Sequence, residues 1–140
     1  MYKNHDIIHS FAFMYTAFAH LTDGEVDDSE KKVIGTKVWE WLCTFDKDVT
    51  GDGKIDGDDV ISILFDDVFP FYDSMDGQGR VDEFNRIVSM QTSQDWWTDD
   101  MSNMVLRDLE DIAMADGKLY DTEQEWLSIL TKAYGVTVTA

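Results

Sequence analysis

The sequence predicts an all-α protein, a single compact bundle of about six or seven helices that spans residues 1–140 as one domain. Apolar residues recur three or four positions apart in six successive segments, which is the period of a helix. Short Asp-Gly and Gly-x-Gly elements separate several of these segments. No alternating pattern typical of a strand runs longer than residues 136–138. We therefore expect helices packed on helices, without a sheet.

Each predicted helix has an apolar face of its own. The first three faces consist of Ile7, Phe11, Met14, Phe18 and Leu21, of Val33, Val38, Trp41, Leu42 and Phe45, and of Val60, Ile61, Leu64 and Val68. Pro70 should end or kink the third helix, because proline lacks the backbone N–H. The last three faces consist of Val81, Phe84, Ile87 and Val88, of Met101, Met104, Val105, Leu109 and Ile112, and of Trp126, Leu127, Leu130 and Tyr134. Gly135 is placed to stop the sixth helix.

The composition indicates a folded, strongly acidic domain. The net charge is −18, from 29 acidic and 11 basic residues, yet 44% of the residues are hydrophobic and 13% of all residues are aromatic. That apolar content supplies a core that a disordered acidic chain would lack. A field of this sign repels nucleic acid and anionic lipid, and it favours cations or basic partners.

Several apolar residues allow more than one interpretation. Cys43, the single cysteine, lies in the apolar stretch 39–45 and is expected to fill the core. Trp39 and Trp41 cannot both face one core from one helix, so either one is exposed, as at an interface, or several helices bury both; Trp96 and Trp97 pose the same question. Residues 7–18 lack a preceding basic region and read poorly as a signal peptide. With no stretch long enough to span a membrane, we expect a cytoplasmic location.

Two of the turns look like copies of one another. Residues 22–30 and 115–123 share the pattern Asp-Gly-x-aliphatic-x-Asp-(Ser/Thr)-Glu, and each follows one apolar helix and leads into the next. This similarity predicts that the bundle is built from two related helix-turn-helix halves. The acids after each turn could also serve only as helix N-caps, a role that needs no metal.

The segment Asp48–Asp59 matches the twelve-residue EF-hand calcium loop. Oxygen-bearing side chains stand at loop positions one, three, five, nine and twelve, which are Asp48, Thr50, Asp52, Asp56 and Asp59. Gly53 permits the sharp turn at position six, and Lys54 would contribute its backbone carbonyl at position seven. Five aspartates and one lysine leave a local charge of −4, which favours a bound cation. We predict a site for Ca²⁺, or for Mg²⁺ or another divalent ion.

The last position of this loop departs from the commonest pattern. Asp59 stands where a glutamate usually reaches back with both oxygens. The stretch 48–55 also resembles a dockerin repeat, in which aspartate at position twelve is normal. The shorter side chain predicts a dissociation constant nearer the micromolar-to-millimolar end of the EF-hand range.

A degenerate second loop is predicted over residues 74–84. Gly79 and Val81 occupy the glycine and aliphatic positions, and the weaker candidate ligands are Asp76, Gln78, Asp82 and Glu83. Ser74 and Gln78 replace expected acids, and Glu83 arrives about two residues early. Because EF-hands usually work in pairs, we expect this segment to pair with the first loop, either without metal or as a second site.

At residues 11–34 and 103–136 the chain resembles the TerB-like family, which is associated with tellurite resistance and related stress responses. The motifs that carry the resemblance are residues 19–26 and 112–119, each followed by a glutamate. The resemblance implies an all-helical fold of two related halves, with acidic metal-binding positions near both Asp-Gly turns. Those positions here are Asp23, Asp27, Glu30, Asp116 and Glu123. Tyr120 is not acidic, and the EF-hand-like segment 38–90 departs from the family's pattern.

These observations predict a calcium- or divalent-metal-binding helical module that acts as a stress-response or partner-binding protein. Two alternatives remain: an acidic interaction protein that needs no metal, and a calmodulin-like calcium sensor with eroded loops. No phosphate loop, Ser-His-Asp order or Cys-His arrangement occurs, and no spacing singles out a catalytic carboxylate pair. We therefore expect no enzyme; the expected partners are a divalent ion and a protein, with no nucleic acid and no transmembrane segment.

Overall fold

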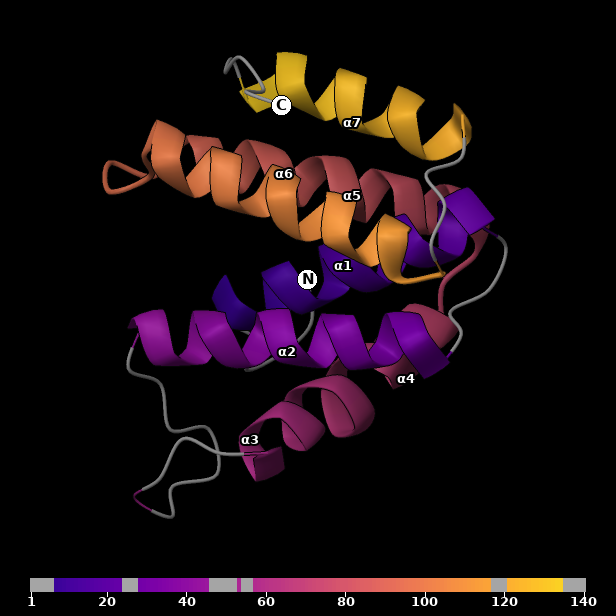
Figure 1. The fold of residues 1–140 in the computed structure, drawn as a ribbon, viewed down its shortest axis with the longest axis vertical. Coiled ribbons are helices and arrows are strands. Elements are labelled where there is room, and N and C mark those ends of the chain that lie inside the picture. The colour runs from indigo at the N-terminus through magenta and orange to yellow at the C-terminus, as the bar shows by residue number, and fades with distance from the viewer. Residues whose placement is uncertain (1–6, 24–27, 46–52, 54–56, 117–120, 135–140) are drawn as a thin grey trace.

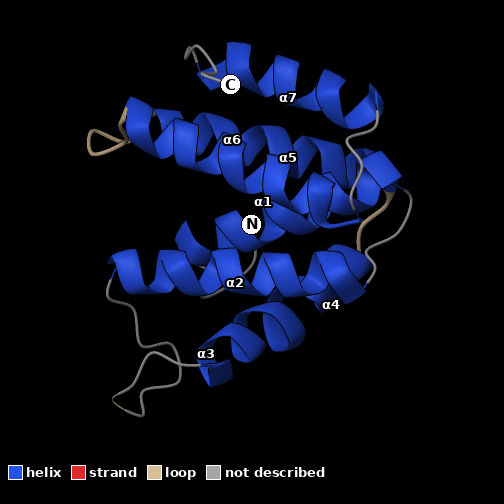
Figure 2. Ribbon diagram, viewed as in Figure 1, coloured by secondary structure: helices blue, strands red, loops and turns tan. Residues whose placement is uncertain are grey.

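The computed structural model describes residues 7–23, 28–45, 53, 57–116 and 121–134. Within those ranges the chain is helical apart from short turns and contains no strand, which confirms the all-α prediction (Figure 2). In chain order the elements are α1 (Ile7–Asp23), α2 (Asp28–Phe45), α3 (Gly57–Ile61), the π-helical η1 (Ser62–Val68), α4 (Phe69–Asp73), α5 (Gly77–Thr92), α6 (Asp99–Ala113), the 3₁₀ turn η2 (Met114–Asp116) and α7 (Asp121–Tyr134). Because α3, η1 and α4 follow one another without a break, the described elements amount to six helical segments.

Helix α1 runs through the middle of the bundle, between α2 on one side and α5 and α6 on the other (Figure 1). It also contacts η1, α4 and α7. Every residue from Ile8 to Ala19 is buried. A helix that is apolar on all sides is expected to be enclosed by its neighbours. The stretch that read poorly as a signal peptide is therefore the central core helix, and no helix in the described ranges has the length and apolar character to cross a membrane.

The few polar side chains of α1 have partners inside the bundle. His9 Nε2 lies 2.8 Å from Asp67 Oδ2 in η1. Thr16 Oγ1 donates to the Ala12 carbonyl at 2.8 Å. Buried polar groups are costly unless they are hydrogen-bonded, so these contacts let polar residues occupy the core.

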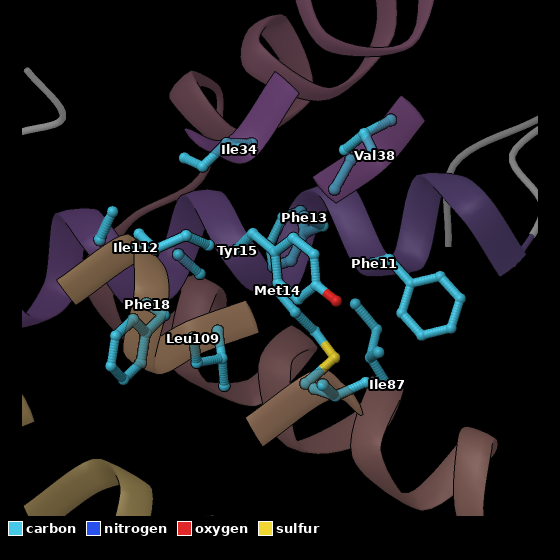
Figure 3. Close-up of a cluster of buried hydrophobic side chains, with 14 of the residues drawn as sticks. Phe11, Phe13, Met14, Tyr15, Phe18, Ile34, Val38, Ile87, Leu109 and Ile112 are labelled. Carbon is cyan, nitrogen blue, oxygen red and sulfur yellow. The ribbon is translucent and has the colours of Figure 1, made fainter. Parts of the chain in front are cut away.

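The core mixes aromatic and aliphatic side chains, with Phe11, Tyr15 and Phe18 of α1 among Ile87, Leu109 and Ile112 (Figure 3). Phe11 stacks on Trp41 with ring centroids 4.0 Å apart and an interplanar angle of 11°. The buried face of α2 contains Ile34, Val38, Trp41 and Leu42. Cys43 lies off this face and is exposed, so the prediction that it fills the core is wrong. Trp39 is also off the face and is 44% exposed, whereas Trp41 is buried.

Pro70 changes the hydrogen bonding of its helix without ending it. The helical chain continues from Gly57 through Pro70 to Asp73. In the preceding stretch η1 the hydrogen bonds run over five residues, and the Phe69 amide donates to the Leu64 carbonyl. Pro70 has no backbone N–H to donate, and the wider π-helical turn before it accommodates the missing hydrogen bond.

The helix boundaries follow the repeat predicted from the two Asp-Gly turns. Helix α1 ends at Asp23 and α2 begins at Asp28, while η2 ends at Asp116 and α7 begins at Asp121. These are equivalent positions of the two sequence copies. The end of α1, the start of α2, η2 and the start of α7 lie at one end of the bundle, where η2 packs against α2 (Figure 1).

Candidate metal centre

The strongest candidate site lies between α2 and α3, at segment 48–59. Of the predicted ligands, Asp48, Thr50, Asp52, Lys54 and Asp56 lie outside the described residues. The described part consists of Gly53, the residues from Gly57 onward, and the two helices that hold the ends of the segment.

Gly53 has the backbone conformation that an EF-hand loop requires at position six. Its φ angle is +83°. Residues other than glycine rarely adopt this left-handed region, because their Cβ approaches the following carbonyl oxygen. An ideal Cβ placed on Gly53 would have no neighbour within 4 Å, so only the backbone conformation calls for glycine here.

Helix α3 starts where the outgoing helix of an EF-hand loop starts. Gly57 stands at loop position ten, and Asp58 and Asp59 lie in the first turn. Carboxylates in the first turn of a helix interact favourably with its dipole. Asp59, the predicted ligand at position twelve, is 0% exposed. A carboxylate in such a place must be compensated by a hydrogen bond, a cation or both.

The incoming helix is held by aromatic contacts close to its end. Phe45, the last residue of α2, stacks on Phe11 at 6.3 Å and on Trp41 at 5.9 Å between ring centroids. The exposed Trp96 approaches the Phe45 ring edge-on at 5.8 Å. The outgoing helix α3 contacts α2, and a Cβ added to Gly35 of α2 would lie 3.7 Å from Val60 Cγ1. The helices on both sides of the segment are therefore packed against the bundle.

The second predicted loop, at residues 74–84, is not formed. Helix α5 begins at Gly77, so the residues expected to wind around an ion are its first turns. Asp76 is the N-cap, with extended backbone angles, and its Oδ1 accepts a hydrogen bond from the Gly79 amide at 2.6 Å. An aspartate at this position satisfies one of the unpaired amides of a helix start. The glycine spacing belongs here to a capped helix.

The other candidate ligands of this segment contact their helical neighbours. Gln78 Nε2 donates to Asp82 Oδ1 at 2.8 Å, across one turn of α5. Glu83 is buried, and its two carboxylate oxygens accept hydrogen bonds from Nε and Nη2 of Arg86. These side chains are engaged with one another, with a backbone amide or with Arg86, and the geometry gives no support to a second site there.

The TerB-like positions are only partly described. Glu30 is buried in the first turn of α2, close in sequence to the first Asp-Gly turn. Asp23 ends α1, Asp116 ends η2 and Glu123 lies in the first turn of α7, but their side chains, and the whole of Asp27, lie outside the described residues. The contact between η2 and α2 brings the two Asp-Gly regions to the same part of the bundle.

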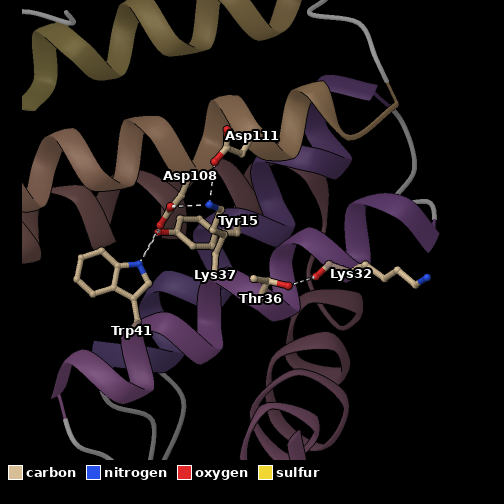
Figure 4. A network of polar contacts seen from close by, with 7 residues as sticks. All are labelled: Tyr15, Lys32, Thr36, Lys37, Trp41, Asp108 and Asp111. Carbon is tan, nitrogen blue, oxygen red and sulfur yellow. Dashed lines mark hydrogen bonds and ion pairs between the residues drawn. The ribbon is translucent and has the colours of Figure 1, made fainter.

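A buried polar cluster joins α1, α2 and α6, and sequence reasoning did not find it (Figure 4). Asp108 Oδ2 accepts hydrogen bonds from Tyr15 Oη at 2.5 Å and from Trp41 Nε1 at 3.0 Å. Lys37 Nζ lies 3.6 Å from Asp108 Oδ1 and 2.8 Å from Asp111 Oδ2. One carboxylate thus receives donors from two other helices and ties the bundle together.

Burial shifts the pKa values of two groups in this cluster. Desolvation raises the pKa of Asp108 above its ordinary value, although the hydrogen bonds from Tyr15 and Trp41 and the charge of Lys37 oppose the rise. Burial, and then the charge of Asp108, also raises the pKa of the Tyr15 hydroxyl. Asp108 lies between Val105 and Ile112 on the apolar face of α6. Its position on that face, three residues after one apolar residue and four before the next, is the sequence feature that could have predicted a buried acid.

No group of three or more His, Cys, Asp or Glu residues that could hold a metal ion occurs within the described ranges. No protein-family model, no curated protein and no solved structure matches the chain. The EF-hand-like and TerB-like assignments therefore rest on the residues and on the helix boundaries around them.

Proposed function

We propose that this chain is a calcium-binding helical module whose metal site is segment 48–59. The observation that carries the proposal is the left-handed Gly53 at loop position six, followed by a helix that starts at position ten. Asp48, Thr50, Asp52, Asp56 and Asp59 would supply side-chain oxygens, and Lys54 its backbone carbonyl. We assign the chain a binding role and no catalytic one.

Charge and geometry favour Ca²⁺ over other divalent ions. Five aspartates within twelve residues repel one another, and a bound cation removes that repulsion. Calcium accepts six to eight oxygens in flexible geometry, whereas Mg²⁺ demands a near-ideal octahedron and keeps several waters. A loop whose ligands come from one continuous segment suits the more tolerant ion.

The test is a calorimetric titration of the full chain with CaCl₂, together with thermal unfolding. Calcium at a hundredfold over its dissociation constant should add about 2.7 kcal/mol to the free energy of unfolding. Asp48→Ala combined with Asp52→Ala should abolish both the heat and the stabilisation. The control is Asp76→Ala, which removes an acid of the other glycine-rich segment and should leave calcium binding intact.

Trp96 provides an independent readout. Its ring touches Phe45, three residues before the first predicted ligand. Ordering of the loop around calcium should change the tryptophan emission, and Trp96→Phe should remove most of that change. A titration that shows neither heat, nor stabilisation, nor a fluorescence change would refute the proposal.

We propose the TerB-like positions as a weaker, separate metal site at the end of the bundle. The buried Glu30 and the packing of η2 against α2 support it. Metal counted per chain in the Asp48→Ala/Asp52→Ala variant tests it, because any ion that remains must be bound elsewhere. The residual metal should be lost when Glu30→Gln is added. A stress-response role rests on the resemblance of residues 11–34 and 103–136 alone.

A further inference from the structure

The helical stretch Gly57–Asp73 exposes large apolar side chains on its outer side. Ile61 is 52% exposed and Phe65 is 54% exposed. The Phe69 ring, which is half-buried, meets Phe65 edge-on with centroids 5.1 Å apart. We call these three residues the 61–69 ridge. Contiguous exposed apolar side chains of this kind mark interaction sites more often than isolated ones do.

The ridge belongs to a firmly packed helix. On its opposite side Asp59, Ile63, Leu64 and Val68 are buried, and η1 contacts the central helix α1. His9 of α1 binds Asp67 between these layers. The ridge is therefore held outward by the core, which pre-organises it for binding.

The surroundings of the ridge are purely acidic along its own helix. Residues 57–73 contain five aspartates and no lysine, arginine or histidine. Three of them are exposed: Asp66 lies within the span of the ridge, Asp58 three residues before it and Asp73 four residues after it. An apolar strip bordered by carboxylates is complementary to an apolar strip bordered by lysine or arginine.

We propose that the 61–69 ridge docks a basic amphipathic helix of a partner protein. A second copy of this chain is the wrong occupant, because a two-fold contact would place one acid-bordered patch against another patch of the same charge. An anionic membrane surface is repelled by the same carboxylates. None of the three ridge residues is a predicted calcium ligand, so this inference is separate from the calcium proposal.

The test uses the full chain and a synthetic Leu/Lys amphipathic peptide of about four helical turns, with affinity measured by fluorescence anisotropy. Ile61→Ser combined with Phe65→Ser should weaken binding at least about tenfold, equivalent to about 1.4 kcal/mol. The matched control is Ile129→Ser on α7. Ile129 is 65% exposed but lines a different apolar groove, of about 270 Å³, between α5 and α7. This control should bind the peptide as tightly as the parent.

A charge variant separates ridge binding from a folding defect. Asp66→Asn with Asp73→Asn leaves the apolar residues in place, and it should weaken binding several-fold and flatten its dependence on salt. Both variants should keep the helical circular dichroism spectrum of the parent protein, which shows that they are folded. Equal weakening by Ile129→Ser, or equal binding of a Ser/Lys peptide without an apolar face, would overturn the proposal. So would a dimer in sedimentation that the ridge variant dissociates, or tighter binding to anionic vesicles than to the peptide.

Discussion

Segments 48–59 and 74–85 share a glycine and an aliphatic residue at the same spacing but differ in structure. In the first, Gly53 is left-handed and a helix begins only at Gly57. In the second, α5 begins at Gly77, six residues earlier in the shared register, and Gly79 lies inside the helix. The spacing of glycine and aliphatic residues is thus compatible with a metal loop and with a capped helix.

The neighbouring side chains account for the difference. Asp76 accepts the Gly79 amide and starts the helix, and Arg80 secures it by donating to the Tyr72 carbonyl at 3.0 Å and lying 4.2 Å from the centre of the Tyr72 ring. Segment 48–59 instead carries five aspartates and one lysine. Closely spaced like charges disfavour a helix, so local charge, and not the glycine spacing, distinguishes the two segments.

The largest expected difference between the segments is in calcium affinity. Asp59→Ala removes the carboxylate at loop position twelve and should weaken calcium binding roughly 100-fold, about 2.8 kcal/mol. Asn85→Ala, at the equivalent position of the other segment, should have no measurable effect. Isothermal titration with calcium measures the affinity of both variants. Asp59→Asn is added as a variant that keeps the shape of the side chain and removes its charge. Similar affinities for Asp59→Ala and Asn85→Ala would remove the distinction between the two segments.

A smaller effect is expected at the left-handed glycine. Gly53→Ala should cost about 1–2 kcal/mol, because alanine is strained at positive φ. Gly53→Asn should cost less, since asparagine tolerates this region better. Chemical unfolding of the calcium-loaded protein measures both variants. Full stability of the alanine variant would contradict a left-handed turn in the loaded state.

Removing the cap of α5 should cost about 1 kcal/mol. Asp76→Ala leaves the Gly79 amide without its acceptor, whereas Asp76→Ser retains one. Urea unfolding should therefore order the free energies of unfolding as parent, serine variant, alanine variant. A loss of calcium affinity in the alanine variant would instead give Asp76 the ligand role that its geometry does not support.

The smallest effect has the opposite sign. Gly77→Ala should stabilise the protein by about 0.5 kcal/mol, because alanine restricts the unfolded chain and suits a helix. The space around its Cβ position is open, with nothing within 4 Å. A decrease in the urea midpoint would argue that residue 77 does not lie in a helix.

Most of the fold could be predicted from local pattern. The apolar faces of α2, α5, α6 and α7 follow the helical period, and the repeated Asp-Gly turns predict equivalent boundaries at Asp28 and Asp121. The burial of a side chain outside those faces is predicted wrongly when it is judged from the apolar character of its neighbours and not from its position around the helix. Cys43 was assigned to the core because its neighbours are apolar, yet it lies beyond the buried face and is exposed.

For the candidate site, the residue types and the glycine register of segment 48–59 were predictable, and the fate of segment 74–84 was not. The spacing of the glycine and aliphatic residues in this segment is equally compatible with Gln78 and Glu83 on a loop and with both on a helix. Their partners, Asp82 and Arg86, become neighbours only once the helix has formed.

The amino-acid sequence by itself determined the helical period, the acidic charge and the twelve residues proposed to surround calcium, because these are properties of neighbours along the chain. Only the tertiary structure decided that α1 is enclosed on every side, that Asp108 joins Tyr15 to Trp41, and that Ile61 and Phe65 remain outside. Burial is a relation between distant segments. The choice of which apolar side chains are covered is therefore made when the helices pack.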